Sequence, residues 1–115
     1  MLRNGRYSAW FRTRQGTGVM QQEGMGIIEL NDGKVTGRDT VLAYTGSYVV
    51  DGDKFTALIA TERHTRGHPS AFGIGIDDVN LTLTGKSTPT TASCTGAAEQ
   101  APGLAFEAVL VRMAD

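Results

Sequence analysis

Short runs of alternating hydrophobic and polar residues dominate the chain. In the clearest run, VNLTLTGK at residues 79–86, hydrophobic positions at Val79, Leu81 and Leu83 alternate with polar ones. A period of two is typical of a β-strand with one buried face, because successive side chains of a strand point to opposite sides. The run therefore predicts a strand with one face in a hydrophobic core and one face in water.

The same alternation recurs along the chain, and glycine-containing turns separate the runs. Asn31, Asp32 and Gly33 lie between two apolar segments, and Asp51-Gly52-Asp53 lies between two others. Glycine at such positions supplies the positive φ that short hairpin loops require. Helix signals are nearly absent. The runs predict eight strands, near residues 4–13, 18–30, 34–38, 41–50, 54–64, 79–87, 90–96 and 104–112.

The connections between these strands indicate the fold. Most are short enough for sequential hairpins, and residues 65–78 are expected to form one long loop with a short helical turn after Pro69. Eight antiparallel strands joined in order close most simply into an up-and-down barrel, which leaves no exposed sheet edge. We predict an all-β, eight-stranded antiparallel up-and-down β-barrel that forms one domain over residues 1–115, with an open sandwich as the alternative.

The inward faces predict an aromatic lumen. A barrel of about eight strands has an interior that side chains fill, or that holds one small ligand. The candidate lumen residues are Tyr7, Phe11, Tyr44, Tyr48, Phe55 and Phe106. The glycines expected to point inward are Gly24, Gly26, Gly46, Gly85 and Gly96. These glycines relieve crowding beside the rings or leave a cavity, and the pattern does not choose between the two.

Several strands carry hydrophobic residues on both faces. In the first strand Tyr7 and Phe11 share one face, and Trp10 falls on the other. The apolar residues expected to point away from the lumen are Val41, Ala43, Leu58, Val109 and Val111. Such a surface predicts a covering layer, and pairing with a second copy as a homodimer would supply one. The loop of residues 65–78 is the alternative cover.

The net charge and the single cysteine indicate which partners and which cellular compartment to expect. Eleven Lys and Arg against twelve Asp and Glu give a net charge of −1, which offers no general attraction to nucleic acid or to an anionic membrane. No apolar run approaches the roughly 20 residues that span a bilayer, and the first residues lack the apolar core of a signal peptide. Cys94 is the single cysteine, so a reducing compartment is the default. We expect a cytoplasmic protein without direct nucleic-acid or membrane contact.

The first part of the chain is basic. Arg3, Arg6, Arg12 and Arg14 all precede the first acidic residue, Glu23. We interpret them as solvated side chains on the outer face of a strand, with contact to a partner as the alternative.

The polar residues form no catalytic or metal-binding pattern. His64 and His68 have a helical zinc spacing, but Gly67 and Pro69 flank the second histidine and no third ligand is in view. Asp51-Gly52-Asp53 lacks the ordered series of oxygen ligands of a calcium loop. No two carboxylates are paired by spacing for acid and base catalysis, and no glycine-rich loop has the context of a phosphate site. We therefore expect no metal, no cofactor and no enzymatic activity; an enzyme that uses the loop histidines is the least favoured hypothesis.

The order of several short motifs resembles the GrlR-like family over nearly the whole chain. These motifs are Asn4-Gly5-Arg6-Tyr7, Asp32-Gly33 followed by Gly37 and Asp39, Tyr44-Thr45-Gly46-Ser47-Tyr48, Gly52 with Phe55, and Leu81-Thr82-Leu83-Thr84-Gly85. The family comprises small bacterial proteins named for a negative regulator of type III secretion gene expression. The resemblance implies a lipocalin-like barrel, a homodimer, and a protein that binds a transcriptional activator and restrains it.

The sequence departs from the family at its activator-binding element. That element is a surface cluster of alternating acids, whereas here glycine splits Asp51 from Asp53, and Asp77 and Asp78 are only a pair. No activator-binding residues are carried over. The sequence thus favours a non-enzymatic interaction protein, a negative regulator that restrains a transcription regulator. The alternative is a small-molecule carrier or sensor that binds an apolar ligand in the barrel lumen.

Overall fold

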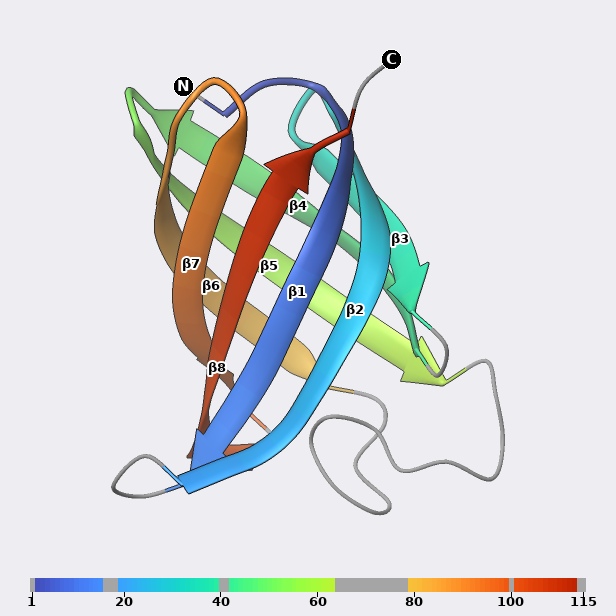
Figure 1. Ribbon diagram of the computed structural model, residues 1–115, viewed down its shortest axis with the longest axis vertical. Coiled ribbons are helices and arrows are strands. Elements are labelled where there is room, and N and C mark those ends of the chain that lie inside the picture. The colour runs from blue at the N-terminus through green and yellow to red at the C-terminus, as the bar shows by residue number, and fades with distance from the viewer. Residues whose placement is uncertain (1, 16–18, 40–41, 64–78, 100, 114–115) are drawn as a thin grey trace.

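The computed structural model describes residues 2–15, 19–39, 42–63, 79–99 and 101–113. These residues form eight β-strands that wrap around one axis (Figure 1). The strands are β1 (Gly5–Gln15), β2 (Val19–Asn31), β3 (Lys34–Asp39), β4 (Leu42–Asp51), β5 (Lys54–Arg63), β6 (Asn80–Ser87), β7 (Thr91–Ala98) and β8 (Ala101–Arg112). The described residues contain no helix that could cross a membrane.

Each strand pairs antiparallel with the next one in sequence, and β8 returns to pair with β1. This closed order confirms the predicted up-and-down barrel and excludes the open sandwich. The predicted strands are also confirmed, with small differences at their ends. The largest difference is in β8, which begins at Ala101 instead of residue 104, because Pro102 and Gly103 interrupt the alternation that marked the strand in sequence.

Alternate residues of every strand point into the barrel and form the core. In β6, Leu81 and Leu83 are buried whereas Asn80 and Thr82 are exposed, as the alternation in this run predicted. Burial of these faces provides the main favourable free energy of folding. The predicted loop of residues 65–78, together with His64 and Val41, lies outside the described residues.

Two-residue turns connect β2 to β3 and β4 to β5 at one end of the barrel. Asp32 has a φ of 50° and Gly33 a φ of 86°, so both central residues of the β2–β3 turn adopt the left-handed conformation of a type I′ hairpin. Gly52, between β4 and β5, has a φ of 61°. Both acidic glycine motifs are therefore turns, as predicted. This end, where β1 begins and β8 ends, is called the terminal end below.

The inward-facing glycines are positions where the barrel has no room for a side chain. A Cβ atom at Gly96 would lie 1.9 Å from the backbone oxygen of Thr82, and one at Gly24 would lie 2.4 Å from the ring of Phe11. A Cβ atom at Gly85 would approach both the Ser93 backbone oxygen, at 2.1 Å, and the ring of Phe55, at 2.8 Å. These glycines relieve crowding, which was the first of the two alternatives.

We predict that Gly96→Ala destabilises the protein by about 2–3 kcal/mol, because the added methyl group collides with the backbone of β6 instead of a movable side chain. The matched control is Gly103→Ala, where an added Cβ would meet nothing within 4 Å, and the expected change is within about 0.5 kcal/mol. Urea unfolding followed by circular dichroism measures both. Equal midpoints for the two variants would contradict the close approach of β6 and β7.

Candidate functional site

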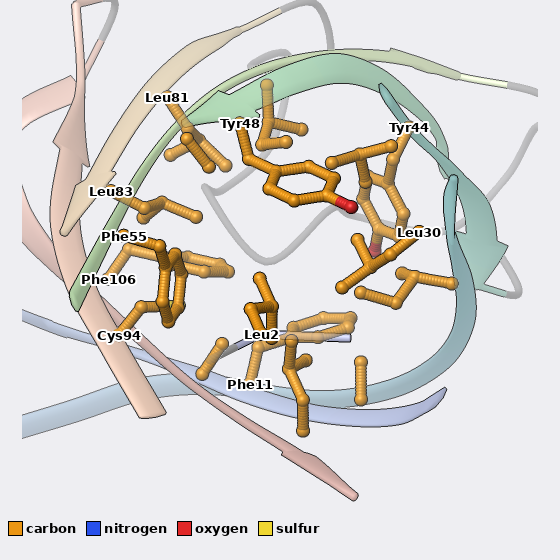
Figure 2. Close-up of a pocket in the computed structure, with 17 residues that line it drawn as sticks. Leu2, Phe11, Leu30, Tyr44, Tyr48, Phe55, Leu81, Leu83, Cys94 and Phe106 are labelled. Carbon is orange, nitrogen blue, oxygen red and sulfur yellow. The ribbon is translucent and has the colours of Figure 1, made fainter. Parts of the chain in front are cut away.

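The barrel lumen holds a small cavity of about 80 Å³. Its wall is apolar, and every strand contributes to it (Figure 2). Five of the six aromatic residues predicted for the lumen lie in this wall: Phe11, Tyr44, Tyr48, Phe55 and Phe106. The structure thus brings these five residues together around one cavity, whose free volume the alternation could not give.

Tyr7 is the sixth predicted residue, and it does not line the cavity. Its side chain is buried, with 1% of its surface exposed, and its hydroxyl donates a hydrogen bond to the backbone oxygen of Arg3 at 2.7 Å. Tyr7 lies near the start of β1, so its ring packs beneath the N-terminal residues at the terminal end. The inward direction predicted for Tyr7 agrees with its burial, but the structure places its side chain away from the cavity wall.

Aromatic packing accounts for the small size of the cavity. The ring of Phe11 stacks on Phe106 with a centroid distance of 5.9 Å, and it meets Tyr44 edge-on at 6.0 Å. Both arrangements are favourable for aromatic pairs. Pockets for drug-sized ligands are usually about 300–1,000 Å³. The lumen is therefore largely filled by its own side chains.

The tyrosine hydroxyls that approach the lumen are bonded to protein groups. Tyr44 donates to the carboxylate of Asp39, whose other oxygen accepts the backbone N–H of Leu42 at 2.6 Å. Burial, this hydrogen bond and the negative charge of Asp39 all raise the pKa of Tyr44 far above its ordinary value. Tyr48 donates to the side-chain oxygen of Asn4 at 3.2 Å. Both hydroxyls already have acceptors within the protein, so the lumen presents a ligand with apolar surface.

Residues 2–4 run across the terminal end of the barrel before β1 begins (Figure 1). Leu2 is buried and lines the cavity. Asn4 bridges to the β2–β3 turn, since its amide nitrogen donates to Asp32 Oδ1 and its amide oxygen accepts the Asp32 backbone N–H, each at 3.0 Å. We call Leu2, Arg3 and Asn4 the N-terminal plug. The sequence pattern missed it, because one leucine before a strand is too weak a signal.

Cys94 also lines the cavity, and it is a free, buried thiol. Burial raises its pKa from 9.0 to about 11, so the thiol is protonated and unreactive at neutral pH. A buried, protonated thiol in an apolar wall is consistent with a packing role for Cys94. Within the described ranges, no three His, Cys, Asp or Glu side chains form a group that could hold a metal ion. His64 and His68 lie outside these ranges.

The outer face of three adjacent strands, β8, β1 and β2, carries a second feature. Large hydrophobic side chains with 43–57% of their surface exposed gather there, and we call them the apolar strip: Trp10, Met25, Ile27, Val109 and Val111. Trp10 pairs with Met25 on β2 and with Val109 on β8. Ser8, in the next outward position of β1, pairs with Ile27 and Val111. The strip is therefore continuous across the three strands.

Two ion pairs bound the apolar strip along the barrel axis. Arg6 contacts Glu29 at 2.8 Å on one side, and Arg12 contacts Glu107 at 2.7 Å on the other. These two arginines were interpreted as solvated, and they are exposed but engaged by acids on neighbouring strands. Arg3 is exposed, and the side chain of Arg14 is not among those that the structure describes. An open hollow of about 800 Å³ lies at one end of the strip, lined by Trp10, Met25, Val109 and the Arg12–Glu107 pair.

The residues expected to point outward do not all share this surface. Val109 and Val111 belong to the apolar strip, and Leu58 is exposed as predicted. Leu58, however, lies on β5, which β6 and β7 separate from β8. Ala43 is only half-buried on β4, and Val41 lies outside the described residues. The residues expected at a dimer surface are therefore split between two regions of the barrel. The larger continuous region is the apolar strip, in which Val109 and Val111 lie beside Trp10, Met25 and Ile27.

Comparison with known proteins gives no match to a family model and no similar curated protein.

We predict that the folding stability falls at alkaline pH and that Cys94 contributes to the fall. The thiol has a pKa of about 11 in the folded protein against 9.0 ordinarily. Its contribution is thus complete below pH 9 and is lost as the pH rises through 11, because the unfolded chain releases its proton first. Urea unfolding between pH 7 and 11 should show wild type losing on the order of 2 kcal/mol more than Cys94→Ala. Tyr44 is present in both proteins and cancels in the comparison, so parallel pH profiles would contradict the burial of the thiol.

Proposed function

We propose that this protein acts by binding other proteins and has no catalytic role. The observation that carries the proposal is the apolar strip, because its five large hydrophobic side chains lie side by side on β8, β1 and β2 and remain exposed. Contiguous apolar surface of this kind marks interaction sites on soluble domains. The largely filled lumen supports the same choice, since it leaves little room for a substrate.

The occupant that we assign to the apolar strip is a second copy of the chain. Homodimer interfaces are more hydrophobic than transient ones, with aromatic residues and methionine enriched at the centre and polar groups at the rim. Trp10 lies on the central strand of the strip, with Met25 on one side and Val109 on the other, and the Arg6–Glu29 and Arg12–Glu107 pairs lie at the margins. This composition supports the homodimer that the resemblance to the GrlR-like family implies.

The resemblance also supplies the class of a further partner, a transcription regulator that the dimer restrains. The family's acidic recognition run is missing here, so this part of the proposal specifies the partner's class and leaves its contact residues unassigned. Exposed acids do occur at the terminal end, where Asp32 and the Asp51–Asp53 turn lie. Regulation through protein contact is consistent with a domain whose described residues offer no metal-binding group.

We predict that wild type is a dimer at micromolar concentration and that Met25→Lys weakens the dimer at least tenfold, because it buries an unpaired charge in the interface. Leu58→Lys is the matched control, since Leu58 and Met25 are both 57% exposed but Leu58 lies on β5. Light scattering over a dilution series measures both. A monomeric wild type, or equal weakening by the two variants, would show that the strip is not the dimer interface.

We predict that affinity capture with the tagged chain in its native host enriches a transcription regulator. Crosslinking before lysis followed by mass spectrometry identifies the captured proteins, and the tag alone serves as the control. Recovery of no regulator above the tag control would refute the regulatory part of the proposal. That result would leave the dimer measurement unaffected, so the two parts are judged separately.

A further inference from the structure

The lumen is closed at the terminal end by a segment that is not part of the sheet. Among the described residues, Leu2 is the only cavity-lining residue outside the eight strands. Figure 2 shows the Leu2 side chain among the aromatic rings and leucines of the lumen, all of which belong to strands. Leu2 therefore occupies space that belongs to the lumen, although the barrel's hydrogen-bond ladders do not hold it there.

Side-chain hydrogen bonds fix the N-terminal plug to the terminal end. Asn4 exchanges two hydrogen bonds with Asp32 and accepts a third from the hydroxyl of Tyr48. The backbone oxygen of Arg3 accepts the hydroxyl of Tyr7. None of these bonds belongs to a strand ladder, so the plug can move aside while all eight strands remain paired. Water at the terminal end can replace these polar partners when they separate.

We propose that the lumen is a binding site for a small, uncharged, apolar molecule about the size of one aromatic ring, which takes the place of the Leu2 side chain when the N-terminal plug moves. The existing cavity of about 80 Å³ lies next to the space that Leu2 fills. Apolar cavities of about 150 Å³ elsewhere stay dry and bind benzene. Vacating the Leu2 position brings this lumen toward that size without moving any strand.

The wall selects the chemical class of the ligand. Phe11, Phe55 and Phe106 present rings, and the remaining lining is mostly aliphatic. Tyr44 and Tyr48 direct their hydroxyls to Asp39 and Asn4, so a polar ligand would lose its water without gaining a partner. Charged molecules are excluded for the same reason. This site uses the inner surface of the barrel, and it is independent of the apolar strip and of the proposed interaction function.

The test is a titration with benzene followed by two-dimensional amide NMR on wild type, Leu2→Ala and Leu58→Ala. Leu2→Ala should bind benzene at least tenfold more tightly than wild type, because truncation enlarges the lumen and removes the competing side chain. Leu58→Ala is the matched control: it loses the same atoms from the outer face and should bind as wild type does. Saturable shifts are expected for Phe11, Cys94 and Phe106.

The N-terminal plug has its own readout. In wild type, benzene should also shift the amide signals of Leu2 and Asn4. Asn4→Ala keeps Leu2 but removes the bridge to Asp32, so it should bind benzene faster than wild type does.

Binding with no change at residues 2–4 would overturn the plug as the moving part. A folded Leu2→Ala that shows no saturable shift in the lumen, or shifts only at Trp10 and Val109 on the outside, would overturn the site. If Leu2→Ala does not fold, wild type and Asn4→Ala still decide the question.

Discussion

The pairing of β1 with β8 is the constraint on which the rest of the structure depends. The ladder runs from Tyr7 opposite Arg112 to Gln15 opposite Leu104, and it turns an eight-stranded sheet into a barrel without free edges. Closure creates the lumen, and it forces alternate side chains of all strands into one confined volume. It also places β8 beside β1, which makes the apolar strip continuous across β8, β1 and β2. Both candidate sites are therefore consequences of one ladder.

Confinement within the lumen explains why glycines lie opposite aromatic residues on the inner face of the barrel. An eight-stranded barrel has an interior that side chains can just fill, and the large rings of Phe11, Phe55 and Phe106 line what remains of it. Gly24 and Gly85 face two of these rings, where a Cβ would overlap them. The remaining cavity lies next to the N-terminal plug. The free volume is thus adjacent to a segment that is held by side-chain hydrogen bonds and not by a strand ladder, which is the arrangement that a gated site requires.

The inner and outer surfaces support different kinds of binding. The apolar strip is broad, exposed and bounded by ion pairs, which suits a protein surface. The lumen is small and offers apolar contacts, which suits a molecule of a few carbon atoms. Because the strip lies on the outer face of the strands and the N-terminal plug lies across the barrel end, occupation of one does not sterically exclude the other. A dimer that also holds a small apolar ligand is compatible with this geometry.

The sequence by itself determined the eight strands, the up-and-down order, the inward direction of the six aromatic residues and the outward direction of Trp10, Leu58, Val109 and Val111. These features follow from alternation with a period of two and from turn residues, which are local properties of the chain. Only the tertiary structure decided between barrel and sandwich, the small free volume of the lumen, the partners of Asn4 and the neighbours of Trp10. Asn4 bonds to residues 28 and 44 positions away, and Trp10 meets Val109 through barrel closure. Strand pairing and ring packing bring such distant residues together, and a local pattern contains no information about either.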